Sequence, residues 1–130
     1  MQYALLIYTE EPTSAPTPEQ IQAEIEAYDV FTRSVRESGA FVAGEALHPS
    51  PTATTVRIRD GQTLTTDGPF AETKEVLGGF YLVNAADLDE AIGMAVLIPS
   101  AKSGSVEIRP VIDWNDPAFA SPPTSEAVAG

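Results

Sequence analysis

The order of the predicted elements favours an α+β fold, a ferredoxin-like βαββαβ sandwich with an inserted β-hairpin. Strand, helix and strand patterns follow one another twice along the chain, which is the split arrangement of that fold. Its central strands, residues 3–8 and 80–83, are apolar on both faces, whereas both helices cover the same face of the sheet. Because soluble monomers rarely expose apolar patches above roughly a few hundred Å2, the other face needs a cover. The sequence therefore predicts a two-fold homodimer with a barrel-like centre.

The first strand and the first helix have clear local patterns. Residues 3–8 are apolar or aromatic without alternation, which is typical of a strand buried on both faces. Thr17 and Gln20 form a capping box around Pro18, which suits the first helical position. Gly39 is placed to end this helix. Its apolar side chains recur at spacings of three and four and so share one side: Ile21, Ile25, Tyr28, Phe31 and Val35.

The next stretch contains a second strand and the inserted hairpin. Residues 41–47 read as a strand that ends before a proline-rich loop. Residues 54–59 alternate between apolar and polar side chains, and a tight-turn dipeptide, Asp60-Gly61, follows them. Residues 62–66 then form the returning strand. The pattern predicts a hairpin over residues 54–66.

The last part of the domain repeats the strand, helix and strand order. Residues 80–83 form a central strand, and Asp87 begins a helix that Pro99 ends. Residues 106–112 form the final strand. We expect one domain over residues 1–113. The remaining residues, 114–130, form a C-terminal tail with little to bury, and we expect residues 119–130 to be mobile or to contact a partner.

Composition excludes several classes of function. The 130-residue chain has 7 basic and 19 acidic residues, and its net charge of −12 would repel nucleic-acid phosphates. It has no cysteine, which excludes disulfides and thiolate metal sites. No apolar run approaches the ~18 residues of a membrane span. The N-terminus lacks a basic leader and reads as a strand. We expect a cytoplasmic protein that binds neither nucleic acid nor membrane.

The segment 66–80 has the most unusual local chemistry. Asp67 can accept hydrogen bonds from turn amides, and Lys74 lies between two glutamates. Phe70 follows a glycine and a proline that fix its direction, so it either wedges into the core or forms a wall of a cleft. The Gly78-Gly79 pair leaves room for a bulge or for a ligand. Two interpretations stay open. The segment is a structural turn that rejoins the hairpin to the sheet, or Asp67 and Lys74 face a pocket with Phe70 in its wall.

The same segment carries a resemblance to a known family. Residues 67–70 (DGPF), 72–75 (ETKE) and 77–81 (LGGFY) resemble the DGPF branch of the YCII-related family. Further matches lie in the opening strand, at residues 54–57, and in the second helix and final strand. Together they cover roughly residues 1–113.

The resemblance implies a dimeric ferredoxin-like α+β barrel, but most members of the family have no assigned reaction. A few relatives are associated with small-molecule chemistry on ring compounds. A shorter branch carries a proposed His–Asp pair, and the matching position of this chain holds Tyr28, in a helix without histidine. This departure argues against general-base catalysis by a histidine. Many DGPF members are encoded beside extracytoplasmic-function sigma factors, which implies such a factor as a candidate partner.

Other residues are candidates for ligand contacts. His48, the sole histidine, is either a loop residue or a proton shuttle. Arg109 is either part of a structural ion pair or an anion clamp. The serines at 100, 103 and 105 have no identifiable base partner. One histidine without cysteine leaves only carboxylates as metal ligands, so we expect no metal and no organic cofactor. Three tyrosines complete the set of candidate ligand-binding residues: Tyr8, Tyr28 and Tyr81.

Two hypotheses of function follow. The first is a small-ligand-binding homodimer with isomerase-type or lyase-type acid–base activity on a small ring compound. In it Asp67 is the base or orienting group, Lys74 or an arginine holds an anion, and a tyrosine donates a proton. The second is a non-catalytic regulatory module in which the same cavity only binds, working with a sigma factor.

Overall fold

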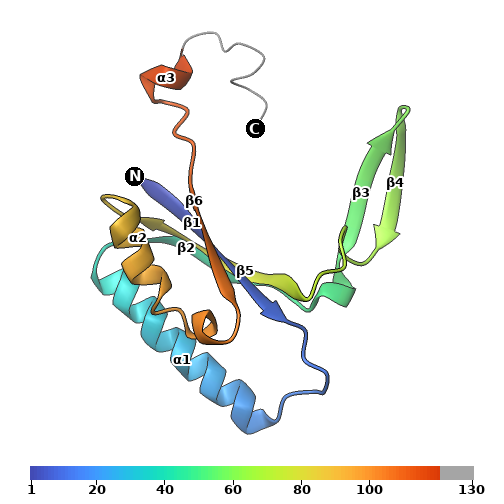
Figure 1. Cartoon of the computed structure of the whole chain (residues 1–130), viewed down its shortest axis with the longest axis horizontal. Coiled ribbons are helices and arrows are strands. Elements are labelled where there is room, and N and C mark those ends of the chain that lie inside the picture. Colours follow the sequence, from blue (N-terminus) through green and yellow to red (C-terminus); the bar gives the residue numbers. More distant parts are fainter. Residues whose placement is uncertain (121–130) are drawn as a thin grey trace.

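A computed structural model describes residues 1–120 as a four-stranded sheet, two main helices and a separate hairpin (Figure 1). The rest of the expected tail, residues 121–130, lies outside the described residues. The strands are β1 (Gln2–Glu10), β2 (Phe41–Ala46), β3 (Thr54–Arg59), β4 (Gln62–Asp67), β5 (Glu75–Asn84) and β6 (Ser105–Pro110). The helices are α1 (Pro18–Glu37), α2 (Leu88–Ala95), α3 (Pro117–Ala120) and the 3-10 turns η1 (Ser50–Thr52) and η2 (Pro99–Lys102).

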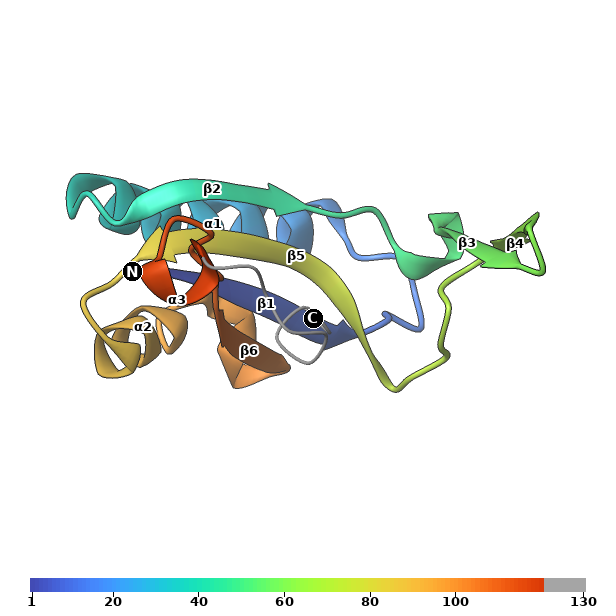
Figure 2. The same ribbon diagram turned by 90° about the horizontal axis from the view of Figure 1, so that it is seen from above.

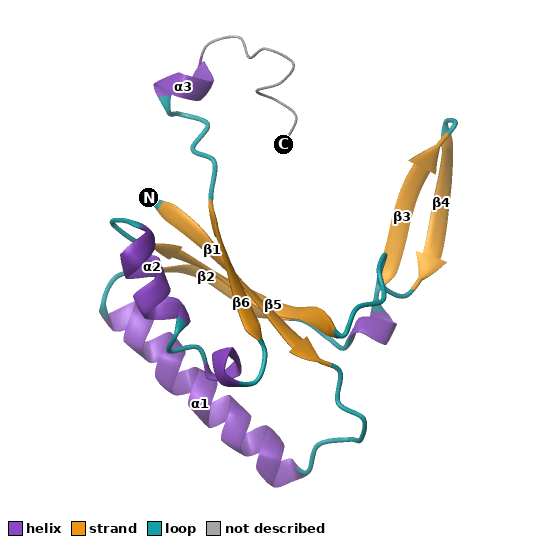
Figure 3. Ribbon diagram, in the orientation of Figure 1, coloured by secondary structure: helices purple, strands orange, loops and turns teal. Residues whose placement is uncertain are grey.

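The main sheet has the order β2-β5-β1-β6, and each neighbouring pair is antiparallel. This order is compatible with the ferredoxin-like fold, and the predicted α+β class is confirmed. Helices α1 and α2 lie on the same side of the strands (Figure 3). In the part of the chain that the structure describes, no helix is long and apolar enough to cross a membrane.

The core lies between this sheet face and the two helices. Strands β1 and β5 alternate, and Leu5 and Val83 are fully buried on the helix side. Phe31 from α1 and Ala91 from α2 pack against them. Ile98, just before η2, fills the end of the core. Burial of these apolar side chains is the main force that holds the helices on the sheet.

Helix α1 has the predicted caps but not a continuous buried face. Thr17 and Gln20 exchange the two capping-box hydrogen bonds, at 3.1 and 2.9 Å. Gly39 follows the helix with a φ of 79°, a conformation that favours glycine. Of the five apolar residues on one side of the helix, only Phe31 and Val35 are buried. The N-terminal half of α1 overhangs the sheet without packing closely on it.

The hairpin forms as predicted, but as a sheet of its own. Strands β3 and β4 pair with each other, and their turn at Asp60 and Gly61 has φ values of 52° and 75°. These positive angles suit the tight turns of two-residue hairpins. Within residues 1–120 neither strand pairs with the four-stranded sheet. The hairpin stands away from the rest of the described chain in both views (Figure 2).

Strand β5 is longer than the predicted strand at residues 80–83. It begins at Glu75, and the glycine pair lies inside it. Ile7 pairs with Gly79 and Tyr8 with Leu77, so Gly78 is the extra residue of a bulge. A Cβ on Gly79 would lie 2.9 Å from the carbonyl oxygen of Glu45, so the close approach of β2 requires glycine here. Of the two uses expected for the glycine pair, a bulge or an approach for a ligand, the structure shows the bulge at Gly78 and close strand pairing at Gly79.

The elements after β5 are shorter than predicted. Helix α2 ends at Ala95 and not just before Pro99, because Val96 and Leu97 turn outward while Ile98 turns into the core. The final strand ends at Pro110, two residues before the predicted end. The tail contains a helical turn, α3, that the sequence pattern did not indicate.

Pairing register fixes which side chains share the sheet face opposite the helices, which we call the open face. Two cross-strand rows run over it. The first is Glu45, Phe80, Leu6 and Glu107; the second is Ala43, Leu82, Ala4 and Arg109. The centre of each row is apolar and its ends include charged residues.

Candidate functional site: a cleft between α1 and the sheet

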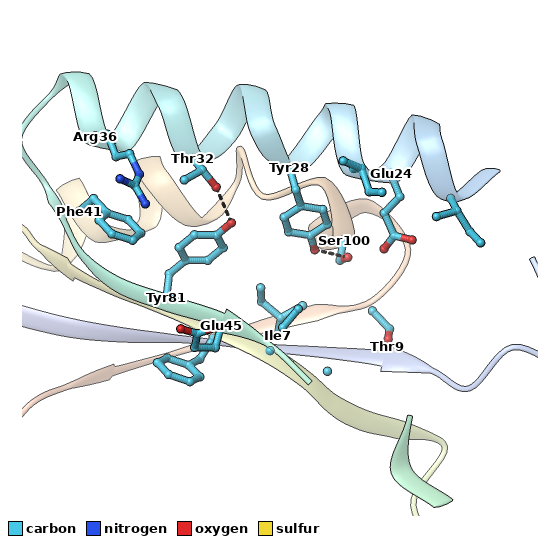
Figure 4. Close-up of a pocket in the computed structure, with 17 residues that line it drawn as sticks. Ile7, Thr9, Glu24, Tyr28, Thr32, Arg36, Phe41, Glu45, Tyr81 and Ser100 are labelled. Carbon is cyan, nitrogen blue, oxygen red and sulfur yellow. Dashed lines mark hydrogen bonds between the residues drawn. The ribbon is translucent and has the colours of Figure 1, made fainter. Parts of the chain in front are cut away.

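A cleft of about 490 Å3 lies between the overhanging half of α1 and the sheet (Figure 4). Ile21 and Ile25 of α1 line it, and Ile25 is 50% exposed. Its lining also includes Gly44 of β2 and Gly78 of β5. The helical spacing of Ile21 and Ile25 predicted a face packed on the sheet, and in the structure these residues form an apolar wall of the cleft instead.

Tyr28 joins α1 to η2 at this cleft. Its hydroxyl oxygen lies 2.5 Å from Oγ of Ser100, and either atom can donate the proton. Burial raises the pKa of Tyr28 above its ordinary value of 10.0, and the hydrogen bond with Ser100 opposes this shift in part. Tyr28 is therefore a neutral hydroxyl at pH 7, able to donate a hydrogen bond into the cleft.

Tyr81 lies deeper, between β5 and α1. Its hydroxyl oxygen is 2.8 Å from Oγ1 of Thr32, and its ring meets that of Phe31 edge-to-face with centroids 4.9 Å apart. A Cβ on Gly44 would lie 2.8 Å from Cδ1 of Tyr81. A side chain at position 44 would collide with the Tyr81 ring, so the packing of this ring against β2 requires glycine there.

The charged groups of the cleft lie on α1 and at the edge strand. The guanidinium carbon of Arg36 is 4.4 Å from the centroid of the Phe41 ring, a cation–π contact that holds both side chains at one end. Glu24 projects from α1 beside Tyr28 (Figure 4). The lining thus combines aliphatic and aromatic surface with a few hydroxyls and charges. Such surfaces suit a small, partly apolar ligand.

The structure brings two predicted ligand-binding residues, Tyr28 and Tyr81, into this cleft. Tyr8, a third residue of that set, lies elsewhere, with the predicted catalytic residue Lys74, in a shallower depression at the ends of β1 and β5. There Nζ of Lys74 is 3.2 Å from Oε1 of Glu10, and both side chains are largely exposed. An ion pair this open to water contributes little to stability.

The remaining predicted residues line neither hollow. Asp67 is the exposed last residue of β4, opposite Thr54. Phe70 is 78% exposed, so it is not wedged into the core of this chain. His48 is an exposed loop residue. Arg109 lies on the open face, where its Nε donates to Oε2 of Glu107 at 2.7 Å.

Sequence reasoning missed several residues of the cleft. Ser100 has a partner in Tyr28, but the two are 72 positions apart and no local pattern connects them. Thr32 is four residues after Tyr28, a helical spacing that places both on one side of α1. This spacing is the feature of the sequence that could have identified Thr32 as a neighbour of Tyr28. Among residues 1–120 no three histidine, cysteine or carboxylate side chains are arranged to hold a metal ion.

Comparison with known proteins gives a family for the chain. The sequence matches the family described as the YCII-related domain over residues 1–115. An uncharacterised protein of Rhizobium meliloti (strain 1021) is 40% identical to it over 114 residues, which cover 85% of this chain and 92% of that protein. Its name assigns no activity. The family match extends over the whole sandwich, the hairpin and the start of the tail, and on this basis the chain belongs to the YCII-related family.

Proposed function

We propose that this chain forms a homodimer that binds a small ring compound in the cleft between α1 and the sheet. We further propose that it carries out acid–base chemistry of the isomerase or lyase type there, with the carboxylate of Glu24, which also lines the cleft, as the base that removes a proton and Tyr28 as the group that supplies one. The observation that carries the proposal is the Tyr28–Ser100 pair in the wall of an apolar cleft.

The size and lining of the cleft support ligand binding. Pockets for small molecules usually measure about 300–1,000 Å3 and combine apolar walls with a few polar groups. The cleft has about 490 Å3, with Ile21 and Ile25 on one wall and aromatic rings on another. A planar ring can lie between such walls, while the hydroxyls of Tyr28 and Tyr81 orient its polar substituents.

The position of Tyr28 supports its role as a proton donor. A general acid must hold its proton at working pH and lie within hydrogen-bond reach of the substrate. A tyrosine hydroxyl already holds its proton at pH 7 and burial raises the pKa of Tyr28 further, so its role depends on its position and not on its acid strength. Ser100, at 2.5 Å, fixes its direction. The proposal gives Asp67 and Lys74 no part in this step, since neither lines the cleft.

The open face supports the homodimer. Leu6, Phe80 and Leu82 give it an apolar centre, and no element within residues 1–120 packs on them as α1 and α2 pack on the other face. A second copy of the same sheet is self-complementary to this surface, as a two-fold interface requires. Sheets that pack in this way lie about 10 Å apart with interdigitated side chains.

The test is a thermal-shift screen of phenol, catechol, benzoate and a six-membered lactone. A compound present at 100 times its dissociation constant stabilises the folded protein by about 2.7 kcal/mol. Ile25→Arg fills the cleft with a charged chain and should remove the shift. Val30→Arg is the control, because Val30 lies on the same helix outside the lining and is 65% exposed. Equal shifts in both variants would place binding outside this cleft.

Turnover of any bound compound is then followed by NMR of the compound itself. Tyr28→Phe should preserve the thermal shift and abolish conversion. Asp67→Asn should affect neither. Loss of conversion in Asp67→Asn alone would transfer the acid–base role to Asp67 and contradict the role given to Tyr28.

A further inference from the structure

We propose that the hairpin of β3 and β4, residues 54–67, is an arm that clasps a second copy of this chain. This inference rests on the homodimer proposed above and assigns to the dimer a contact outside the sheet. We call residues 54–67 the arm.

The arm is isolated from its own chain. Every residue of β4 is exposed, as are five of the six residues of β3. At its base Gly68 donates its N–H to the carbonyl oxygen of Ala53 at 2.7 Å, and Thr55 donates its hydroxyl to the carbonyl of Gly68 at 2.9 Å. These bonds close the hairpin without joining it to the core. Because a lone two-stranded hairpin is marginally stable in water, the arm needs another surface to become well ordered.

One side of the arm is suited to burial. Val56 and Ile58 are 60% and 65% exposed and lie on the same side of β3. By register their partners on β4 are Thr65 and Thr63, so the outer part of this side consists of β-branched residues, while Asp67 opposite Thr54 lies at its base. The other side carries the arginines of β3 and Leu64. The arm is thus amphipathic, although within the described chain its apolar side covers nothing.

The direction in which the arm projects indicates which molecule it contacts. Both the arm and α3 project to the side of the main sheet opposite α1 and α2 (Figure 1). The open face lies on that same side. A second sheet packed on the open face therefore lies next to the arm, whereas the body of its own chain does not reach the arm. Continuity between the open face and the arm makes a second copy the fitting partner.

The distribution of charged residues also favours a second copy of the chain as the partner. The chain carries a net charge of −12, yet two of its 7 basic residues, Arg57 and Arg59, are on the arm. Within residues 1–120 neither arginine forms an ion pair. The body of a second copy presents carboxylates at the edge of its open face, with Glu45 exposed there. Because both arginines lie on the side of the arm away from the proposed contact, they contribute longer-range attraction that steers association and not a direct ion pair in the interface.

The arms also enlarge the proposed interface. A stable interface buries about 800 Å2 on each partner. The apolar residues at the centre of the open face, such as Leu6 and Phe80, are already partly covered by their neighbours. Two arms, one from each protomer, add exposed apolar surface to the same interface.

Photo-cross-linking tests this contact directly. The chain has no cysteine, so Thr65→Cys is labelled at one position with a benzophenone. Thr65 shares the side of Val56, and Thr66→Cys places the same label on the opposite side as a matched control. We expect Thr65→Cys to give a covalent dimer after irradiation, joined to a residue outside the partner's arm. Thr66→Cys should give at least about fivefold less.

The outcomes separate the arm from the dimer. If sedimentation equilibrium finds the unmodified protein monomeric, both the homodimer and the clasp are wrong. If the protein is dimeric but Thr65→Cys forms no cross-link between chains, the clasp is wrong and the dimer stands. Equal cross-linking from both labels would overturn the assignment of the Val56 side as the contact.

A second measurement does not depend on the label. Val56→Asp combined with Ile58→Asp should raise the dissociation constant of the dimer about tenfold or more, because each places a charge in a contact that excludes water. The secondary structure of the body should stay as in the wild type in circular dichroism, since the arm lies outside the core. A dissociation constant within twofold of the wild-type value would contradict the clasp.

Discussion

The hydroxyl oxygen of Tyr81 lies 2.8 Å from Oγ1 of Thr32, and this bond joins β5 to α1 at the inner end of the cleft. The bond is partly buried, so it is protected from competition with water. Beyond it toward the N-terminus of α1, the helix and the sheet separate. The Tyr81–Thr32 pair therefore marks where the core ends and the cleft begins.

Removal of this bond should lower stability without changing the fold. Tyr81→Phe keeps the ring and its contact with Phe31 but leaves the Thr32 hydroxyl without its partner. We expect the free energy of unfolding to fall by about 1 kcal/mol, the net contribution of a typical hydrogen bond. Urea denaturation measures this change. Tyr3→Phe is the control, because within residues 1–120 the Tyr3 hydroxyl makes no hydrogen bond, and an equal loss there would contradict the account.

Gly44 should be required for packing rather than for backbone freedom. In Gly44→Ala the new methyl group meets the Tyr81 ring at 2.8 Å and displaces it. Overpacking of this kind costs about 1–3 kcal/mol. Gly93→Ala is the matched comparison: it lies in α2, and no described atom outside its own helix turn comes within 4 Å of its added Cβ. It should gain about 0.5–1 kcal/mol. Similar effects of the two changes in thermal unfolding would be inconsistent with the packing role of Gly44.

The raised pKa of Tyr28 predicts a loss of stability in alkali. The folded protein binds the Tyr28 proton more tightly than the unfolded chain, whose tyrosine titrates near its ordinary value of 10.0. The stabilisation from this proton is therefore complete below about pH 10 and is lost as pH rises through the higher folded pKa. Urea denaturation across pH 8 to about 11 should show a shallower decline for Tyr28→Phe than for the wild type. Parallel curves would show that Tyr28 is not desolvated.

The open face should control assembly. Leu6→Asp introduces a carboxylate at its apolar centre, between Phe80 and Glu107 in the cross-strand row. Because a buried unpaired charge is costly, we expect the dimer to dissociate at micromolar concentration in sedimentation velocity. Val30→Asp makes the same change on the outer side of α1 and should leave the dimer intact. Dissociation in both variants, or in neither, would argue against the open face as the interface.

The features that sequence predicted well are those with local causes. The capping box of Thr17 and Gln20, the stop at Gly39 and the turn at Asp60-Gly61 depend on residues a few positions apart. The element order then restricts the sheet topology, since the strand–helix–strand rule leaves few arrangements. These features could be read from the chain with no knowledge of its long-range contacts.

The features that sequence reasoning missed depend on distant contacts. The glycine pair was expected to leave room for a bulge or for a ligand, and it forms a bulge, but pairing with β1 extends the strand back to Glu75, before its predicted start at residue 80. Ile25 and Phe31 have the same helical periodicity, and only the divergence of α1 from the sheet decides which one is buried. Asp67 and Lys74 stood out because of their unusual neighbours. In the structure, residues 68–74 connect the arm to β5. The catalytic roles of Asp67 and Lys74 stay a hypothesis.

The most direct test of the proposed binding site is a two-dimensional NMR titration with the ring compound that gives the largest thermal shift. Backbone amide signals report which residues change their surroundings as the compound is added. The proposal predicts shifts in α1 from Ile21 to Arg36, in β2 and around Tyr81, with little change at residues 66–75. Shifts confined to residues 66–75, with the α1 signals unmoved, would contradict it.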